Sequence, residues 1–203
     1  MNYYNNDGAW ETFCLNGLAC SAFLLNNKFK IEPKRIECNN IIYPLVVIND
    51  NNISVEIMSP IYKEKNIIIE NLNANYIDSG AKHLVIHYTN PWINELKLEK
   101  LSRKIRYNEQ LFPGGINVNY YKQINDNTIE VKTYEKGVES MMTSCASGSY
   151  ACAYEYSLKK NIKNQIKVLN DGGNFSVIFS DNYKKNIIKL KSKIEYSETI
   201  KIN

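Results

Sequence analysis

The chain has 203 residues, of which 44% are hydrophobic and 23% are charged, and these are ordinary proportions for a soluble globular protein. The net charge of +4 is mild and the basic residues are scattered, so we expect no nucleic-acid partner. The best apolar run, residues 41–48, is too short to cross a bilayer, and we expect no membrane partner. The first residues lack the layout of a secretory signal, so the cytoplasm is the expected location.

The chain has five cysteines and two histidines, and these numbers limit which disulfide or metal sites it can form. An odd number of cysteines in a cytoplasmic chain argues against a disulfide framework. A zinc site is not expected either, because no Cys-x-x-Cys pair is present. The cysteines are therefore expected to be free thiols, either buried or reactive.

The first third of the chain combines one apolar helix with short strands. A helix is predicted over residues 16–27, followed by strands over 41–48, 54–57 and 67–70, with Asn and Asp clusters as the turns between them. The segment 59–65, which contains Ser-Pro and three charged residues in a row, predicts a domain boundary.

The rest of the chain is also predicted to combine helices with short strands. A strand is predicted over 84–88, and the helix after it has an expected apolar face of Ile93, Leu96, Leu101 and Ile105. Further on, the pattern predicts a hairpin of 117–121 with 128–134, a helix after Ser147, and tail strands with turns at 171–173 and 181–182. The fold class is therefore α+β, in two similar halves.

Two segments resemble each other across the chain, residues 13–22 (FCLNGLACSA) and residues 144–153 (SCASGSYACA). Each has a Cys, one further residue, a small polar residue and Gly, and then a helix-forming run with a second Cys. Asn16 and Ser147 are residue types that cap helices, so Cys14 and Cys145 are expected at or just before a helix N-terminus. The second cysteines, Cys20 and Cys152, fall inside the helices and are expected to serve packing.

A thiol at a helix N-terminus is suited to proton transfer. The unpaired N–H groups and the helix dipole there favour negative charge, so the pKa of Cys14 and Cys145 is expected to be lowered. The same N–H groups hold anions such as a carboxylate. Two such thiols on opposite sides of one bound carbon form an acid/base pair.

The sequence resembles the diaminopimelate epimerase family through motifs that occur in order. Residues 5–8 with 13–20 resemble the family's N-x-D-G…C-G-N-G-x-R-C block, and 144–148 with 133–138 resemble its Y-E-R-G…C-G-T-G block. Residues 55–60 resemble the family's inter-domain strand, and residues 77–83 resemble its D-x-G-N-P-H motif. Residues 112–118 resemble its F-P-x-x-x-N-V motif, and residues 171–173 resemble its late P-G-G turn.

The resemblance implies a fold of two pseudo-symmetric α/β domains, each a curved, mostly antiparallel sheet around a central helix. The expected boundaries are an incomplete N-terminal domain over 1–64, a C-terminal domain over 65–190, and a tail strand over 191–203 that returns to the N-terminal domain. The family's first strand-and-helix segment would be missing. The resemblance also allows a homodimer.

The resemblance further implies an isomerase that converts LL-2,6-diaminopimelate to the meso form without PLP or another cofactor and without a metal. Cys14 and Cys145 would be the catalytic acid/base pair, acting on a small amino-acid substrate. The implied substrate-binding residues are Asn5, Leu15, Asn16, Asn117, Glu135, Lys136, Ala146 and Ser147.

Some positions differ from the family pattern, and these differences leave the substrate and the catalytic activity open. Ala81 and Lys82 replace its Asn-Pro, and Lys136 replaces its Arg, which keeps the charge but loses the bidentate fork. Leu15 and Ala146 replace glycines. A related racemase for another amino acid, such as histidine, and a truncated non-catalytic relative therefore stand beside the leading hypothesis.

Overall fold

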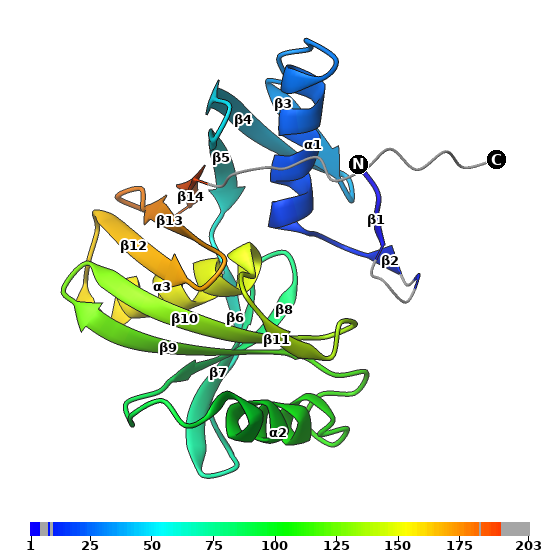
Figure 1. Ribbon diagram of the computed structural model, residues 1–203. Helices are drawn as coiled ribbons and strands as arrows, with labels where there is room; N and C mark the ends of the chain where they lie inside the picture. Colours follow the sequence, from blue (N-terminus) through cyan, green and yellow to red (C-terminus); the bar gives the residue numbers. More distant parts are fainter. Residues whose placement is uncertain (5–7, 9, 183, 192–203) are drawn as a thin grey trace.

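A computed structural model describes residues 1–4, 8, 10–182 and 184–191 (Figure 1). In this part of the chain the helices are α1 (Leu15–Asn27), α2 (Glu95–Arg106) and α3 (Ala146–Lys160). The strands of its first half are β1 (Tyr3–Tyr4), β2 (Trp10–Glu11), β3 (Arg35–Cys38), β4 (Ile41–Asn49), β5 (Asn52–Met58), β6 (Ile61–Ile69) and β7 (Leu72–Asp78). Those of its second half are β8 (Lys82–His87), β9 (Asn117–Asn125), β10 (Thr128–Glu135), β11 (Ser140–Met142), β12 (Gln165–Asn170), β13 (Gly173–Ile178) and β14 (Lys185–Lys191).

One long sheet runs through the described chain, in the order β3-β4-β5-β14-β13-β12-β10-β9-β8-β7-β6, with β11 paired to β10. Its pairs are antiparallel apart from β10 with β12 and β8 with β9. Figure 1 shows α1 beside β3 to β5, and α2 below β9 at the opposite end of the molecule. Helix α3 packs against β8, β9, β10 and β12 and also touches α1. The predicted α+β class is confirmed.

Helix α3 is central because almost every residue in its first three turns is small or aromatic. Its residues from Ala146 to Ala153 are all buried, so no side of this stretch faces solvent. Together with buried residues of α1 and of the strands on either side, it forms the larger of two hydrophobic clusters. Cys152 is fully buried, as predicted, but Cys20 is exposed on α1, so its predicted packing role is wrong.

The predicted apolar face of the second helix is partly wrong. Leu96 is 69% exposed, whereas Leu98, Ser102 and Ile105 are buried. The helix begins at Glu95 with Asn94 as its N-cap, and this start sets the face at positions 98, 101, 102 and 105. The buried face covers the smaller hydrophobic cluster, on the outer side of β8 to β10.

Asparagines form several of the predicted turns. Asn39 and Asn40 both have positive φ, 50° and 59°, and connect β3 to β4 as a two-residue hairpin turn. Glu70 and Asn71, at 48° and 60°, connect β6 to β7 in the same way. The sequence did not predict β3 or β7, because polar residues interrupt their apolar alternation.

Strand β6 begins earlier than predicted and passes through the segment 59–65 that was expected to be a boundary. It lies at the edge of the sheet, where its lysines face solvent and Asn66, with φ 59°, falls at a register irregularity. The division into domains at 64/65 stays a prediction. Strand β14 pairs with β5 and so links the end of the described chain to its first half. Residues 192–203, on which the predicted tail strand falls, lie outside the described residues.

Candidate active site

Cys14 and Cys145 are the N-cap residues of α1 and α3, both in an extended backbone conformation. The carbonyl oxygen of each cysteine accepts the first hydrogen bond of its helix, from the N–H of Leu18 and of Ser149 respectively, at 2.9 Å in both cases. The sequence had predicted caps at Asn16 and Ser147, which instead lie in the first turns. As N-cap residues, the cysteines place their sulfur atoms at the helix ends. The Sγ of Cys14 accepts a hydrogen bond from the N–H of Gly17 at 3.3 Å.

The two helix starts face the same space because hydrogen bonds connect the segments around them. The side chain of Asn16 donates to the carbonyl of Ser144 at 3.3 Å. The hydroxyl of Thr12 donates to the carbonyl of Gly80 at 2.8 Å, and the hydroxyl of Ser79 donates to the carbonyl of Ser147 at 2.9 Å. Residues far apart in the sequence are thereby held around one cavity.

The cavity has a volume of about 400 Å³, which suits a small molecule. It is lined by both cysteines and by every predicted substrate-binding residue that the structure describes, namely Leu15, Asn16, Asn117, Glu135, Lys136, Ala146 and Ser147. Asn5 lies outside the described residues. The cavity is also lined by Ala81 and Lys82 and by residues to which the sequence assigned no role in binding, namely Tyr3, Glu11, Thr12, Phe13, Pro113, Gly114 and Gly115.

Burial raises the pKa of both thiols, contrary to the expected lowering. Cys145 is 8% exposed, and its pKa rises to about 12 because of burial first and the nearby Glu135 carboxylate second. The pKa of Cys14 is also raised, mainly by burial. The helix N–H groups do lower both pKa values, but the cost of desolvating a thiolate is larger.

The two thiols have different neighbours. The hydroxyl of Tyr3 makes a hydrogen bond with Cys14, which favours the thiolate of Cys14. Cys145 makes a hydrogen bond with the Glu135 carboxylate, and that interaction favours the thiol of Cys145. Burial raises the pKa of Glu135, so this carboxyl is a better proton acceptor than an exposed one.

Behind Cys145 lies a buried polar chain. Its Sγ is 3.6 Å from the hydroxyl of Ser147, which is 3.2 Å from Nε2 of His83. The side-chain amide of Asn119 donates to Nδ1 of His83 at 3.1 Å, so the proton of the neutral ring is on Nε2 and points to Ser147. Burial lowers the pKa of His83 to about 3 and keeps the ring neutral. Ser147 is then free to donate its own proton to the sulfur.

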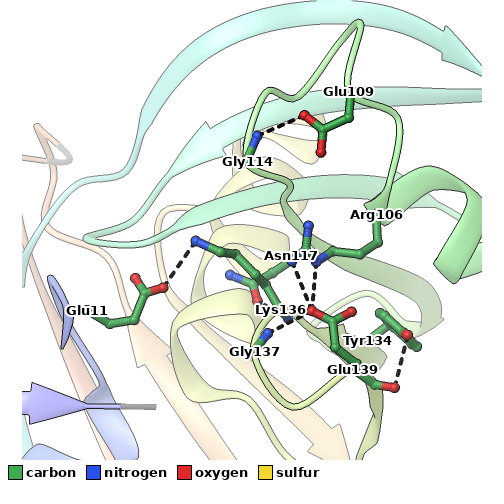
Figure 2. A network of polar contacts seen from close by, with 9 residues as sticks. All are labelled: Glu11, Arg106, Glu109, Gly114, Asn117, Tyr134, Lys136, Gly137 and Glu139. Carbon is green, nitrogen blue, oxygen red and sulfur yellow. Dashed lines mark hydrogen bonds and ion pairs between the residues drawn. The ribbon is translucent and has the colours of Figure 1, made fainter. Parts of the chain in front are cut away.

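A second polar network includes three residues that line the cavity, namely Glu11, Asn117 and Lys136 (Figure 2). The ammonium of Lys136 lies 3.1 Å from the Glu11 carboxylate, and the backbone N–H of Lys136 donates to Oδ1 of Asn117 at 2.8 Å. Arg106 donates twice to the Glu139 carboxylate, at 3.1 and 2.9 Å, and so fixes the turn that follows Lys136.

Among the described residues, His, Cys, Asp and Glu side chains form no group of three that is arranged to hold a metal ion. The described helices also include none with the length and apolar character needed to cross a membrane. The expected absence of a cofactor rests on the family resemblance and stays a prediction.

Comparison with known proteins agrees with this geometry. The family model for diaminopimelate epimerase matches residues 75–194, more than half of the chain. The chain belongs to the diaminopimelate epimerase family. It is 29% identical over 194 residues to the diaminopimelate epimerase of Aquifex aeolicus, covering 90% of this chain and 67% of that protein. The corresponding enzyme of Thermotoga maritima is 30% identical over 173 residues, covering 85% and 69%.

Solved structures show the same fold at low identity. A probable proline racemase from Agrobacterium radiobacter superimposes with a TM-score of 0.71 at 14% identity, over 95% of this chain and 69% of that one. A hydroxyproline epimerase from Agrobacterium vitis gives 0.67 at 13% identity, over 90% and 65%. As a diaminopimelate epimerase family member with an epimerase fold, the protein is an isomerase that acts on amino acids.

Proposed function

We propose that this protein converts LL-2,6-diaminopimelate to meso-diaminopimelate by a two-base mechanism without PLP. The observation that carries the proposal is the placement of Cys14 and Cys145 as N-caps of two helices that open into one cavity. The curated relatives are named for this reaction. In the proposed roles, one thiolate removes the α-proton while the opposite thiol donates a proton to the other face of the carbon.

The α-carbanion is the difficult species, because an amino acid without an electron sink is a very weak carbon acid. Backbone N–H groups at Asn16 and Ser147, in the first turns of the two helices, would stabilise charge that develops on the α-carboxylate. A bound carboxylate would also make direct use of the two helix ends that face the cavity. Exclusion of water by the substrate strengthens these dipoles.

The proton that leaves Cys145 when it acts as the base has an acceptor in the Glu135 carboxylate. On the other side, the Tyr3 hydroxyl stabilises the Cys14 thiolate. The asymmetry suits a resting enzyme with the base at Cys14 and the acid at Cys145. After each inversion the two thiols have exchanged proton states, and the reverse reaction starts from the exchanged form.

We also propose the family's organisation for the chain, with pseudo-symmetric halves at 1–64 and 65–190 and a tail over 191–203. Its support is the equivalent position of the two N-cap cysteines and the central place of α3 in the second half. The cytoplasmic location, a small amino acid as the partner and a homodimer belong to the same proposal.

One observation favours a second candidate, a racemase for another amino acid. Lys136, which would hold the far carboxylate of diaminopimelate, is already paired with Glu11, and Ala81 and Lys82 line the cavity where the family has Asn and Pro. Incubating the protein in D₂O with LL-diaminopimelate, histidine, glutamate or lysine separates the candidates. The substrate is the amino acid that acquires α-deuterium and inverts.

The decisive variants are Cys14→Ala and Cys145→Ala, with Cys20→Ala as the matched control. Each of the first two is expected to abolish conversion of the LL to the meso isomer, measured by chiral chromatography, because each removes the acid or base on one face. Cys20 is exposed on α1, two turns inside the same helix, and its loss is expected to leave the rate unchanged. Inversion that persists in either catalytic variant would contradict the two-base assignment.

A further inference from the structure

A second cavity, with a volume of about 500 Å³, lies between the last turns of α3 and the strands β6, β7 and β8. No residue lines both this cavity and the one that contains the two cysteines. Cys145 caps the N-terminus of α3, whereas Lys159, which lines the second cavity, belongs to its last turn. The two cavities therefore adjoin opposite ends of the same helix.

The lining of the second cavity is polar, although it lies between a helix and a sheet. Leu158 is the only aliphatic side chain among the described residues that line it. Asn73 and Asn75 of β7 and His87 of β8 point from the sheet into this space, where an apolar side chain would otherwise pack against α3. A polar lining at such a place suits the binding of a polar molecule.

The carboxylate of Glu155 is already bonded inside the protein. Its side chain is buried, its Oε1 accepts from the hydroxyl of Tyr121 at 3.2 Å, and its Oε2 accepts from the side-chain amide of Asn75 at 3.0 Å. Glu155 is also the only acidic residue among the described residues that line the cavity. The cavity consequently offers a ligand little negative charge.

The basic groups of the cavity form no ion pair with a carboxylate in the described part of the chain. The ammonium of Lys159 lies 3.3 Å from Nδ1 of His87, so it donates to another basic group. The proton of the neutral ring is then on Nε2, for which the described residues provide no acceptor. The ammonium of Lys65 lies 4.3 Å from the centre of the Tyr62 ring. Both lysines are exposed and can turn toward a ligand.

Two asparagine side chains add uncharged donors. The backbone N–H of Asn66 is bonded to Oδ1 of Asn75 at 2.9 Å, which fixes this part of β6 against β7. The side-chain amides of Asn66 and Asn73 line the cavity and have no hydrogen-bond partner among the residues that the structure describes. Donors and positive charge are therefore in excess of acceptors, which is the composition of an anion site.

We propose that this second cavity binds the phosphate group of a small phosphomonoester. A phosphate dianion offers only acceptors, and its charge equals the summed charge of Lys65 and Lys159. A cavity of about 500 Å³ has room for a small organic molecule attached to the phosphate. The inference is independent of the proposed function, because it requires neither cysteine and no particular amino-acid substrate.

His87 should respond to the bound anion. Burial and the ammoniums of Lys159 and Lys160 lower the pKa of this imidazole. A dianion beside Lys159 opposes both causes, so the pKa of His87 is expected to rise on binding. The titratable groups that surround His87 are Tyr121 of β9, Tyr62 and Lys65 of β6, and Glu155, Lys159 and Lys160 of α3.

The two histidines of the chain allow side-chain NMR to follow both cavities in one titration. His87 lines the second cavity, whereas His83 is bonded to Ser147, which lines the cavity with the cysteines. The wild-type protein is titrated at pH 7 with glycerol 3-phosphate and, separately, with inorganic phosphate, against sodium chloride of equal ionic strength. The resonances of His87 are expected to shift and saturate with both, at lower concentration for the ester, while those of His83 stay in place.

Lys65→Met and Lys159→Met are each expected to weaken the binding of glycerol 3-phosphate by about 10-fold, the effect of losing one hydrogen bond to a charged group. The matched controls are Lys63→Met and Lys160→Met, which remove the same charge from positions that do not line the cavity. Lys63 pairs instead with Asp78 at 3.5 Å. Both controls should bind the ester as the wild type does.

Three results would overturn the inference. A shift confined to His83 would place the anion in the cavity of the cysteines. Equal weakening in the lysine variants and in their controls would show a general effect of charge, with no defined site. Saturation with inorganic phosphate but not with glycerol 3-phosphate would exclude a phosphomonoester as the ligand.

Discussion

Cys14 and Cys145 occupy equivalent positions at their helices, yet the side chains around them are not equivalent. Tyr3 donates toward one sulfur, whereas Glu135 accepts from the other. Burial is the main cause that raises the pKa of both thiols, and Tyr3 opposes this rise at Cys14 whereas Glu135 adds to it at Cys145. The difference between the surroundings of the two thiols therefore depends on two single residues, Tyr3 and Glu135.

Tyr3→Phe is expected to slow inversion at neutral pH and to shift the alkylation of Cys14 to higher pH. The phenol hydrogen bond lowers the pKa of Cys14, and its removal leaves burial with less opposition. A loss of one hydrogen bond to a charged group corresponds to about 10- to 100-fold in thiolate population. Mass spectrometry of the Cys14 peptide after timed iodoacetamide treatment measures the shift.

Tyr4→Phe is the matched control, since Tyr4 is the neighbouring residue on β1 and is 57% exposed. Its alkylation profile should superimpose on that of the wild type. If Tyr3→Phe also superimposes, the hydroxyl of Tyr3 has no influence on the thiol.

At the scale of elements, the two helix starts resemble each other in sequence but differ in packing. A Cβ on Gly148 would lie 2.0 Å from Oδ1 of Asn119 and 3.1 Å from Nδ1 of His83. A Cβ on Gly17 would meet Cys14 Sγ at 3.5 Å, which is an ordinary contact. Helix α3 therefore needs glycine at this position for close approach to β8 and β9, whereas α1 does not.

Gly148→Ala is expected to destabilise the protein by about 1–3 kcal/mol, the usual cost of overpacking a rigid site. Gly17→Ala is expected to be neutral or stabilising by up to about 1 kcal/mol, because alanine is the better helix former. Urea unfolding of the two variants measures both effects. Equal destabilisation by the two substitutions would contradict the asymmetry in packing.

At the scale of the whole molecule, the two halves share one sheet and one main core. Strand β14 pairs with β5, and Asn186 at this junction is fully buried, with its amide bonded to Ser59 at 2.9 Å and to Tyr150 at 2.8 Å. The main hydrophobic cluster contains residues of both α1 and α3. Stability measured by unfolding is therefore a property of both halves together.

Global stability is expected to fall as the pH is lowered below about 6.5, the ordinary pKa of histidine. His83 has a folded-state pKa of about 3, so between these values the unfolded chain binds a proton that the folded chain does not. Stability is fully present above the unfolded pKa and is lost progressively as the pH approaches the folded pKa. His83→Gln should remove this part of the slope in urea titrations at pH 7, 6 and 5.

His87→Gln is the matched control for this slope. The pKa of His87 is also lowered, by burial first and then by Lys159 and Lys160, but its ring is only partly buried. Its removal should flatten the slope less than removal of His83 does. An equal or larger effect of His87→Gln would show that the buried chain behind Cys145 does not dominate the pH dependence.

Much of the fold was predictable because local patterns determine it. The apolar runs at 16–27 and after Ser147 form α1 and α3, and the Asn and Asp clusters form turns, some of which require the left-handed conformation that Asn tolerates. The polar first part of β6 and all of β7 were not predictable, since they depend on hydrogen bonds with neighbouring strands rather than on their own apolar alternation. The exposed Leu96 likewise follows from where α2 meets the sheet.

The sequence by itself identified the family through motifs that occur in order, and that resemblance implied the two cysteines and most of the residues that line the cavity. Only the tertiary structure decided that the cysteines cap the helices and that burial outweighs the helix dipole at both thiols. It also brought Tyr3 to Cys14 and Glu11 to Lys136, across 125 positions in the second pair. Local spacing fixes which residues begin a helix, but the pKa of a thiol and the partner of a charge depend on solvent exclusion and on neighbours that only the packed chain supplies.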